Sequence, residues 1–427
     1  MFLLRKVKRF ISSSTLVCIA VLGICWTSYS LTFTQGNATR YQLRGNGSQT
    51  RLPAIQQSNK LAVPPTTNRN GTMENRRSAV LTMCRQNITY KRPYRDHMIL
   101  NKNKHFIFCK ATKTGSTFWG RLLLQVDRHV IGSPYKIKPQ IGPVNIVPTI
   151  REWRNFEAVL KSSTKFIVAR NPLERLYSAY VDKVYSPNPY YWDSLGKYVV
   201  RNFRRPSEST CGHDVTFTEF LKYAVNAETT GRHRDVHVAS LWETCSPCHV
   251  NYDIIGKMET FKDDTTYILE KLNLGMYIDV LRNVSADAVN DALYDTAQAF
   301  VDMRTEALKC ISEHQIVDRI WTKLKARGYV AADMPLPMNL YNKSEETVFK
   351  IFKDVYSESI IKLGRHGLKQ QQKAIYLETL RKIPTETLTQ IGNAYYRDFR
   401  MFGYDHKVDE KLHNSKNSEF AVSDSFF

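Results

Sequence analysis

The first strand–loop–helix pattern in the chain begins with the apolar run HFIFC at residues 105–109, which is typical of a buried strand. The polar loop KATKTGS follows it directly. Residues 117–130 then carry apolar side chains at the i, i+3, i+4, i+7 spacing of an amphipathic helix. These apolar positions are Trp119, Leu122, Leu123 and Val126. The pattern predicts a buried strand that enters a helix through a short polar loop.

A second unit of the same kind starts at the β-rich run KFIVA, residues 165–169, and continues into RNPLERLYSAYVDK. Asn171 is a suitable helix N-cap and Pro172 suits the first helical position. Strands that alternate with helices indicate an α/β domain with a largely parallel sheet. Further helices are expected in the later segments 216–225, 346–356 and 385–402.

The composition adds a strong charge bias to this picture. The chain has 427 residues, of which 42% are hydrophobic, as in an ordinary globular protein, but its net charge is +21. A basic excess of this size favours an anionic partner, whether nucleic acid, an anionic membrane or an acidic polymer. A merely solvated basic surface is the alternative.

The N-terminus predicts the compartment. Residues 1–9 carry four basic side chains, and residues 10–33 carry no charge, which is long enough to cross a bilayer core of about 30 Å. We expect a cytosolic tail at 1–9 and an uncleaved signal anchor at 10–33, with the remainder translocated. A cleaved signal peptide is the alternative.

Glycosylation sequons and cysteines agree with a translocated body. Six N-x-Ser/Thr sequons follow the apolar segment, at Asn37, Asn46, Asn70, Asn87, Asn283 and Asn342. Six cysteines also follow it, an even number that predicts disulfides in an oxidising compartment: Cys84, Cys109, Cys211, Cys245, Cys248 and Cys310. Nucleic acid is then not the expected partner, and an acidic glycan is the natural anionic one.

Composition also divides the translocated part. Residues 34–83 are rich in Asn, Gln, Thr, Arg and Pro without sustained periodicity, which predicts a disordered luminal stem. Residues 84–405 have the composition of one folded catalytic domain, and residues 406–427 form a polar C-terminal tail.

The loop after the first strand is a candidate anion site, because a helix N-terminus offers unpaired amides and the positive end of its dipole. Gly115 permits close approach of the backbone, Ser116 and Thr117 bring hydroxyls, and Lys113 brings charge, with Thr114 between them. No Lys-Ser or Lys-Thr pair follows the glycine, so the loop is not a Walker A motif. A capped turn with exposed lysines is the alternative interpretation.

The second unit supplies a second candidate anion site. Arg170 follows the end of a predicted parallel strand, at the edge where open α/β sheets bind ligands, and Ser178 lies two helical turns further on. Arginine suits bidentate capture of a terminal phosphate. A helix-capping arginine with an ordinary helix serine is the alternative. Two anion sites at one sheet edge suit a ligand with phosphates at both ends.

These segments resemble the two signatures of the Golgi carbohydrate sulfotransferases, nearest to the subgroup of the HNK-1 and the chondroitin/dermatan 4-O enzymes. The matching blocks, in chain order, are KATKTGSTFW, VARNPLERLYSAYVDK, HVASLWETCSPCHVNYDIIGKMET and YYRDFRMFGYD. They span residues 109 to 404, most of the predicted catalytic domain. The second and fourth blocks are specific, whereas the first alone is a weak signal.

The resemblance implies a P-loop-like sulfotransferase fold that binds 3′-phosphoadenosine-5′-phosphosulfate (PAPS) as sulfuryl donor and needs no metal. Lys113, Gly115, Ser116 and Thr117 then correspond to the 5′-phosphosulfate site, with Lys113 also stabilising charge on the leaving oxygen, and Arg170 and Ser178 match the 3′-phosphate ligands. A general base should accept the proton of the acceptor hydroxyl.

His237 is the candidate for that base, because its distance from Cys245 matches a histidine of the family. A structural histidine is the alternative, and His233 is a competing base. Glu174 is interpreted as a charge on a helix surface.

The cysteines and several departures from the family pattern need separate interpretation. Cys245 and Cys248 lack the context of a redox or zinc pair, so structural disulfides are expected. The resemblance implies that Cys84 pairs with Cys109. The family pattern is not kept at Thr112, Phe118, Asn171 and Val238. Of these, Phe118 and Val238 are expected near the donor and acceptor sites. Residues 321–380 form a longer segment than the resemblance implies, either an acceptor-shaping insertion or a surface elaboration.

Together these observations predict a single-pass type II Golgi membrane enzyme with a luminal catalytic domain, which sulfates an anionic glycan or proteoglycan. Chondroitin or dermatan, at the 4-hydroxyl of N-acetylgalactosamine, is the expected acceptor. One alternative is a catalytically inactive, glycan-binding member of the same fold. A Mg²⁺-dependent P-loop kinase or hydrolase is disfavoured by the absent Lys-Ser/Thr pair and by the luminal placement. The sequence leaves the oligomeric state open.

Overall fold

The structure is a computed structural model that describes residues 67–86, 92–101, 103–137, 156–204, 211–337 and 340–408. All of them belong to one unit, residues 64–427. The predicted cytosolic tail and signal anchor, and the sequons at Asn37, Asn46 and Asn87, lie outside the described residues. No helix within the described ranges is long and apolar enough to span a bilayer.

A four-stranded sheet organises the unit, in the order β1 (Met98–Asn101), β2 (Phe106–Cys109), β3 (Thr164–Ala169) and β4 (Ile254–Lys257). The β2–β3 and β3–β4 pairs are parallel, whereas β1 runs antiparallel to β2. The predicted α/β class is therefore confirmed, but the sheet is mixed. The departure has a local reason: β1 and β2 are separated by only a four-residue turn, which is too short for a parallel crossover.

The alternation of side chains along β2 explains why both faces of the sheet are covered. Phe106 and Phe108 point into one hydrophobic cluster, where Phe108 stacks on Phe166 at a ring distance of 4.7 Å. Ile107 and Cys109 point into the cluster on the opposite face. Because every residue of β2 is buried, the strand reads as a continuous apolar run in the sequence.

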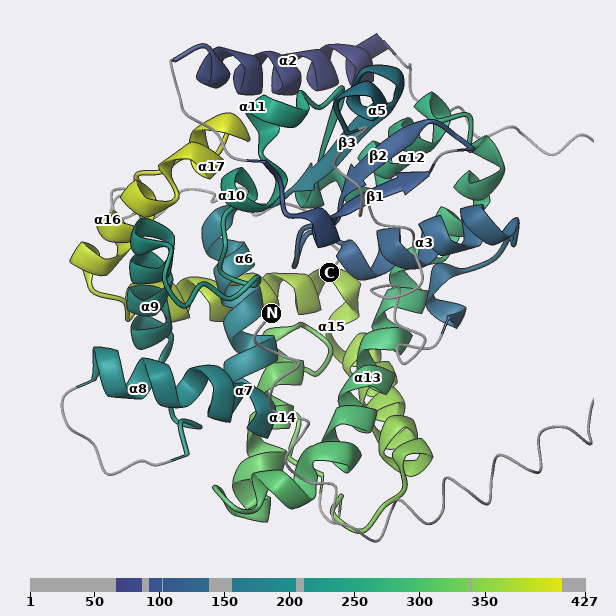
Figure 1. The fold of residues 1–427 in the computed structure, drawn as a ribbon. Helices are drawn as coiled ribbons and strands as arrows, with labels where there is room; N and C mark the ends of the chain where they lie inside the picture. Colours follow the sequence, from purple (N-terminus) through teal and green to yellow (C-terminus); the bar gives the residue numbers. More distant parts are fainter. Residues whose placement is uncertain are drawn as a thin grey trace, which may run out of the picture. The chain divides into compact units, whose positions relative to one another are not determined.

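Helices flank both faces of this sheet (Figure 1). α3 (Ser116–Arg128) and α12 (Phe261–Lys271) contribute to the Phe108 cluster, and α5 (Phe156–Ser162) contributes to the opposite one. Further α-helices in the described residues before residue 284 are α2 (Thr67–Cys84), α6 (Pro172–Ala179), α7 (Pro189–Tyr191), α8 (Lys197–Phe203), α9 (Phe217–Thr230), α10 (Leu241–Cys245) and α11 (Pro247–Val250). Two π-helical segments, η5 (Tyr180–Tyr185) and η6 (Trp192–Gly196), extend α6 and α7.

The last third of the described chain is almost wholly helical: α13 (Val284–Ala307), α14 (Glu313–Ala326), α15 (Glu345–Arg381), α16 (Thr385–Ala394) and α17 (Tyr396–Met401). α13, α14 and α15 pack on one another, around a core that includes Trp321 and Phe352. The segment 321–380 is thus part of a helical layer with a core of its own. α15 bends at Gly364, whose backbone is left-handed (φ 65°).

Local signals in the sequence match the helices that form. The side chain of Asn171 accepts hydrogen bonds from the amides of Leu173 and Glu174, and Pro172 begins α6, as predicted. The helices expected at 216–225 and 346–356 are α9 and part of α15. The segment expected as helical at 385–402 forms two helices, α16 and α17, which are separated at Tyr395.

The segment 67–83, predicted as disordered stem, forms most of helix α2 (Thr67–Cys84), which is a correction to that prediction. α2 packs on α17, β4 and α11, with Met73, Val80 and Met83 buried. The helix has only a narrow apolar side and many polar residues, so its composition resembles that of a stem. Tertiary packing stabilises it. The sequon asparagine Asn70 lies within this helix, whereas Asn283 and Asn342 are exposed.

The six predicted disulfide cysteines form three bonds, Cys84–Cys248, Cys109–Cys245 and Cys211–Cys310. The implied Cys84–Cys109 pair is therefore wrong. Cys109 ends β2 and faces α10, whereas Cys84 ends α2 and faces α11. The Cys-Ser-Pro-Cys segment is thus linked to two different elements, through Cys245 to β2 and through Cys248 to α2.

Candidate active site

The loop between β2 and α3 forms one wall of the candidate site. Lys113 and Gly115 both have left-handed backbones, with φ of 64° and 74°, so the chain turns sharply before α3 begins at Ser116. Thr114 is fully buried and its hydroxyl donates to the carbonyl of Ala111 at 2.9 Å, so the side chain of this predicted donor-binding residue holds the turn together. Ser116 and Thr117 are at least partly open to solvent.

Arg170 extends from the end of β3 to the same edge. Because β2 and β3 are parallel and adjacent, their carboxyl ends meet, and the Arg170 guanidinium donates to the carbonyl of Lys113 at 3.5 Å. Its Nε lies 3.6 Å from a carboxylate oxygen of Glu174 but makes no hydrogen bond to any described residue. A buried guanidinium with an unused donor fits a phosphate oxygen.

Glu174 is buried beside Arg170, which corrects its interpretation as a charge on the helix surface. Burial raises the pKa of its carboxyl, while Arg170 acts to lower it. The carboxylate therefore partly balances the arginine charge from within the protein. Sequence alone could not reveal this, because the burial comes from elements distant in the chain.

Ser178 ends up beside a cation that the sequence did not identify. Nη1 of Arg327 donates to the Ser178 hydroxyl at 3.2 Å, and Nη2 donates to the Ser178 carbonyl at 3.1 Å. Ser178 lies eight residues beyond Arg170, roughly 12 Å along a helical axis. Arg170 precedes α6 and Ser178 lies near its C-terminal end, so only the length of the arginine side chain lets the two residues serve one ligand, and Arg327 adds a charge beside Ser178.

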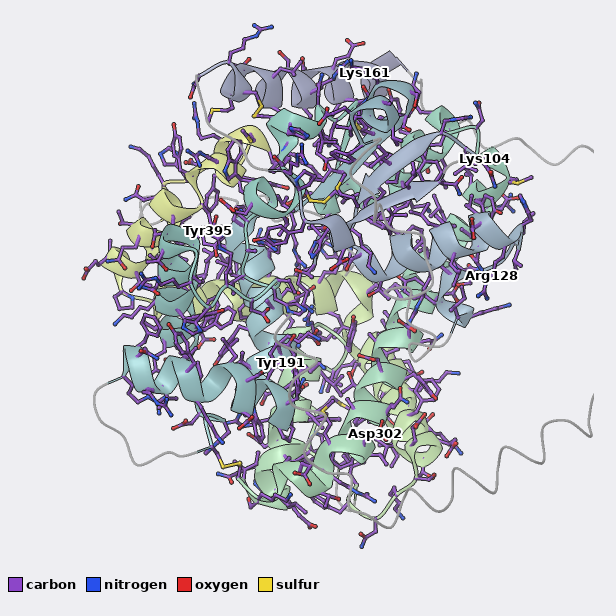
Figure 2. The ribbon with its side chains drawn as sticks, viewed as in Figure 1. Lys104, Arg128, Lys161, Tyr191, Asp302 and Tyr395 are labelled. Atoms are coloured by element: carbon purple, nitrogen blue, oxygen red, sulfur yellow. A yellow bond between two sulfur atoms is a disulfide. The ribbon has the colours of Figure 1, made fainter. Side chains whose placement is uncertain are left out.

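His237 belongs to a segment that touches the loop. The Thr112 hydroxyl donates to the carbonyl of Val236 at 2.9 Å, which fixes the next residue, His237, close to Lys113. His237 Nδ1 lies 2.7 Å from a carboxylate oxygen of Asp235 and 3.2 Å from the hydroxyl of Tyr191. Tyr191 belongs to α7 and is labelled in Figure 2. With Nδ1–H donating to Asp235, Nε2 is left as the acceptor.

The electrostatic setting keeps the imidazole neutral. Burial lowers the pKa of His237, and the positive charge of Lys113 acts in the same direction, while Asp235 opposes both. The competing His233 is exposed and stacks on Tyr198 at a ring distance of 4.5 Å. Of the two histidines, His237 is the one next to the loop.

The charged lysine of the loop, Lys113, belongs to a half-buried ion pair. The Lys113 ammonium pairs with Asp182 of η5, and Lys323 lies 3.4 Å from the other oxygen of that carboxylate. Burial lowers the pKa of Lys113 to about 8, in spite of Asp182. Burial acts to raise the pKa of Asp182, but the surrounding cations, Lys113 foremost, hold it well below its usual range. Both partners are therefore charged at pH 7.

Four residues of the site had no predicted role: Asp182, Asp235, Tyr191 and Arg327. Asp182 lies in the second family-like segment, VARNPLERLYSAYVDK, and Asp235 precedes His237 by two residues. The sequence motifs could therefore have pointed to both residues. Tyr191 and Arg327 reach the site only through the fold. Their segments carry no local signal for such a role.

Two departures from the family pattern have a structural explanation. Phe118 packs edge-on against Phe261 with ring centroids 5.2 Å apart, and Val238 is buried while its carbonyl accepts a hydrogen bond from Tyr395. Both residues lie close to the candidate site in the chain. Their side chains nevertheless fill hydrophobic clusters and do not line the site.

Among the described residues, no group of three or more His, Cys, Asp or Glu side chains could hold a metal ion. The expectation that the reaction needs no metal stays a prediction.

Known proteins are similar to this chain over a much longer stretch than these site residues. The model of the sulfotransferase family matches residues 96–325. Carbohydrate sulfotransferase 11 of Mus musculus is 26% identical over 274 residues, 60% of this chain and 77% of the relative. Carbohydrate sulfotransferase 9 of Homo sapiens is 28% identical over 219 residues, 47% and 48% of the two chains.

Carbohydrate sulfotransferase 10 of Homo sapiens is 30% identical over 196 residues, 41% of this chain and 52% of the relative. No solved structure matches the chain. The family model covers more than half of the chain, including the loop after β2, Arg170, Ser178 and His237. The predicted family is confirmed: the chain belongs to the sulfotransferase family and is a sulfotransferase.

Proposed function

We propose that the protein transfers a sulfuryl group from PAPS to a hydroxyl of an acidic glycan, with chondroitin or dermatan, at the 4-hydroxyl of N-acetylgalactosamine, as the acceptor. The names of the relatives, all carbohydrate sulfotransferases, support a glycan acceptor. The net charge of +21 supports a polyanionic one. The observation that carries the proposal is the meeting of Lys113, Arg170 and His237 at one sheet edge.

The donor fits the residues at this edge. The first amides of α3, with the Ser116 and Thr117 hydroxyls and the Lys113 ammonium, would hold its 5′-phosphosulfate, because a helix N-terminus favours a bound anion. Arg170 and Ser178 would hold its 3′-phosphate. The unused Nε of buried Arg170 supports this role. PAPS supplies the sulfuryl group and a stable leaving group.

His237 would act as the general base. As the acceptor oxygen bonds to sulfur, the bond from sulfur to the 5′-phosphate oxygen breaks, and the hydroxyl proton moves to Nε2 of His237. Asp235 would hold the imidazole in the required tautomer and stabilise the imidazolium that forms. A base of this kind contributes a factor of about 10²–10⁴ in rate.

Lys113 would stabilise the electron pair that the leaving phosphate oxygen takes from the broken bond. The ammonium can do so only while protonated, and its buried position strengthens the interaction because little water screens it. Asp182 favours the protonated state. The ion pair with Asp182 thus favours protonated Lys113 in a site where burial disfavours its charge.

The proposed location is the Golgi membrane, with residues 10–33 as a single type II anchor and the catalytic domain in the lumen. Three disulfides in the described chain suit an oxidising compartment of this kind.

Transfer of radiolabelled sulfate from PAPS to desulfated chondroitin, dermatan, heparan and N-glycan acceptors tests the function. We expect label on chondroitin or dermatan with the wild type, and at most a few per cent of it with Lys113→Ala, Arg170→Ala or His237→Ala. A protein that binds PAPS and every glycan but labels none would be the inactive glycan-binding form. Label on the N-glycan alone would contradict the proposed acceptor.

A further inference from the structure

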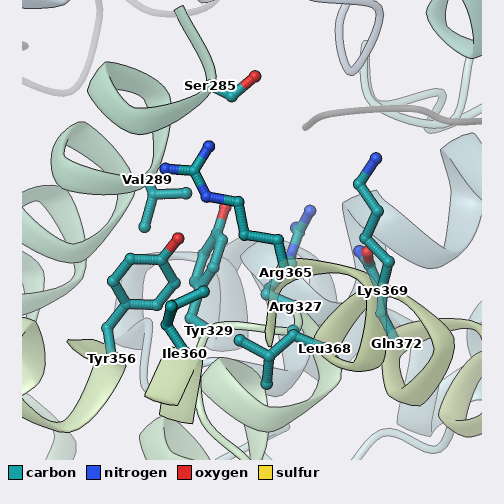
Figure 3. Close-up of a pocket in the computed structure, with 11 residues that line it drawn as sticks. Ser285, Val289, Arg327, Tyr329, Tyr356, Ile360, Arg365, Leu368, Lys369 and Gln372 are labelled. Atoms are coloured by element: carbon teal, nitrogen blue, oxygen red, sulfur yellow. The ribbon is translucent and has the colours of Figure 1, made fainter. Parts of the chain in front are cut away.

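A cavity of about 70 Å³ lies between α13, the C-terminal end of α14 and α15 (Figure 3). Its lining includes Arg327 and Tyr329 after α14, and Tyr356, Arg365, Lys369 and Gln372 of α15. In Figure 3 the guanidinium of Arg365 lies above the hydroxyl groups of Tyr329 and Tyr356, and the ammonium of Lys369 lies across the cavity from it. With Ser285 of α13, the cavity is lined by polar groups from three separate chain segments.

The charged residues that line this cavity are all cationic. Arg327, Arg365 and Lys369 are cations, and none of the described residues that line the cavity is acidic. Tyrosine hydroxyls and the Gln372 amide add hydrogen-bonding groups, while Val289 and Ile360 provide an apolar wall. Cations beside hydroxyl and amide groups favour an oxyanion that accepts several hydrogen bonds.

The size of the cavity limits what it can take. A single water needs about 10–15 Å³ measured in the same way, so the cavity has room for a small group of atoms and not for a whole disaccharide. A charged substituent of a sugar fits such a space while the ring remains outside. The exposed position of Arg365 gives a long chain access to it.

Arg327 connects the cavity to the candidate active site. Its guanidinium lines the cavity and also binds the hydroxyl and carbonyl of Ser178. Its charge is close enough to Lys113 to act against protonation of that lysine, after the larger effect of burial. A glycan with one sugar at Lys113 and His237 can therefore place a neighbouring sugar near the cavity.

The cationic residues that line the cavity lie in a different part of the chain from the candidate donor-site residues. The family match ends at residue 325 and contains the loop, Arg170, Ser178 and His237, whereas the cationic lining residues all follow it. A sulfuryl donor is shared by a family, but its acceptors differ. Residues beyond the shared region are therefore the natural place for recognition of the acceptor.

We propose that this cavity binds the carboxylate of an acidic sugar in the acceptor glycan, beside the sugar that receives sulfate. The proposal rests on the proposed function and adds a specificity site to it. A carboxylate is the anion in question because an unsulfated glycosaminoglycan carries its charge on uronic acids. Arg365 and Lys369 form the charged contacts, and Arg327 links the carboxylate subsite to the donor site.

Equilibrium binding to the full-length protein tests this inference without turnover. The probes are unsulfated chondroitin oligosaccharide and its carboxyl-reduced form, both titrated with saturating 3′-phosphoadenosine 5′-phosphate so that the donor site is filled. We expect Arg365→Ala to weaken chondroitin binding about fivefold, the effect of one partly exposed charge pair. Binding of the reduced oligosaccharide, which is weaker from the start, should change by less than twofold.

Matched variants separate charge from structure. Arg365→Lys should recover most of the affinity, and Arg381→Ala, which removes an exposed arginine from the end of the same helix, should leave it unchanged. Unaltered chondroitin affinity in Arg365→Ala, or an equal loss for both oligosaccharides, would overturn the inference. So would weaker nucleotide binding with intact glycan binding, because the cavity would then belong to the donor.

The same protein distinguishes the two proposals. If sulfate transfer fails on every acceptor while Arg365→Ala still loses its preference for the carboxylated chain, the proposed function fails and the carboxylate site stands. If transfer to chondroitin occurs with the same acceptor KM in Arg365→Ala and wild type, the function stands and the site fails.

Discussion

Lys113 and Asp182 form a half-buried ion pair that joins the loop after β2 to the π-helical segment η5. π-Helical segments occur frequently at functional sites, where the extra residue changes the direction of a side chain. Asp182 here meets Lys113 and Lys323 together. Because burial alone would weaken the charge of Lys113, this carboxylate determines whether the lysine is a cation at the pH of the reaction.

Asp182→Asn tests that dependence. Since Lys113 acts as a cation, activity should fall as pH rises through its pKa of about 8. Removing Asp182 removes an attraction that raises this pKa, so the alkaline limb of the pH–kcat profile should move to lower pH. If the pKa falls by about one unit, or ~1.4 kcal/mol, the protonated fraction of Lys113 at pH 8 drops from about one half to about one tenth, so we expect a loss of about fivefold at pH 8 and a much smaller loss at pH 6. Asp193→Asn, in an exposed pair with Lys197, is the control and should keep the profile. A uniform loss at all pH values would contradict the argument.

The acid limb of the same profile should report His237. Burial lowers the pKa of His237 while Asp235 raises it, so the neutral base is lost only as pH falls below the usual range of histidine. Asp235→Asn should therefore move the acid limb to still lower pH. It should also reduce kcat about tenfold, because the imidazole loses its orientation and the charge that stabilises the imidazolium.

His237→Ala should lose about 10²–10⁴ in kcat and the acid limb with it. His233→Ala is the control, since that histidine is exposed and lies on Tyr198. If the acid limb persists in His237→Ala, another group accepts the proton. Buried His97, whose pKa burial lowers to about 4, would then be the next residue to substitute.

The sequence predicted the strands and helices of the site better than the burial and long-range contacts of its side chains. The apolar run before Lys113 and the Asn-Pro pair before Glu174 are local signals, and β2, β3 and the cap of α6 follow from them. Burial of Glu174 and the approach of Arg327 to Ser178 depend on packing between segments about 150 residues apart, which no local pattern encodes. α2 shows the same limit, since its polar sequence folds only against the rest of the domain.

Asp398 predicts a dependence of stability on pH. It is fully buried in α17 and accepts hydrogen bonds from the amides of Leu241 and Trp242. Burial raises its pKa from 3.8 to about 6, although Arg175 and the two amides act to lower it. A raised pKa means that the native state binds the proton more tightly, so the contribution to stability is complete below pH 3.8 and is lost as pH rises through about 6.

Chemical denaturation between pH 4 and 7 measures this effect. The wild type should lose up to about 3 kcal/mol across the range relative to Asp398→Asn, whose slope lacks this titration. The asparagine variant should be less stable overall, because a single carbonyl oxygen replaces two acceptors of the α10 amides. Asp193→Asn, which alters an exposed carboxylate, is the control and should keep the slope of the wild type. Equal slopes in wild type and Asp398→Asn would show that another buried group carries the dependence.

Gly115 is where backbone geometry and packing both restrict the loop. Its φ of 74° disfavours any side chain, and a Cβ added there would lie 2.7 Å from the ring of Phe261. Gly115→Ala should therefore cost about 1–2 kcal/mol for the left-handed backbone and more for the contact, and it should weaken PAPS binding because the loop must shift. Gly275→Ala, where a Cβ meets nothing within 4 Å and φ is ordinary, is the control.

Phe261→Leu in the Gly115→Ala background separates the two causes. The smaller side chain relieves the contact but not the backbone strain, so the double variant should recover part of the lost PAPS affinity, although Phe261→Leu alone destabilises the core. Isothermal titration with PAPS and a denaturation curve for each of the four proteins provide the cycle. Additive effects would show that Phe261 does not press on the loop. Wild-type PAPS affinity in Gly115→Ala would show that the donor does not need this turn, and the assignment of the loop to the phosphosulfate would then be wrong.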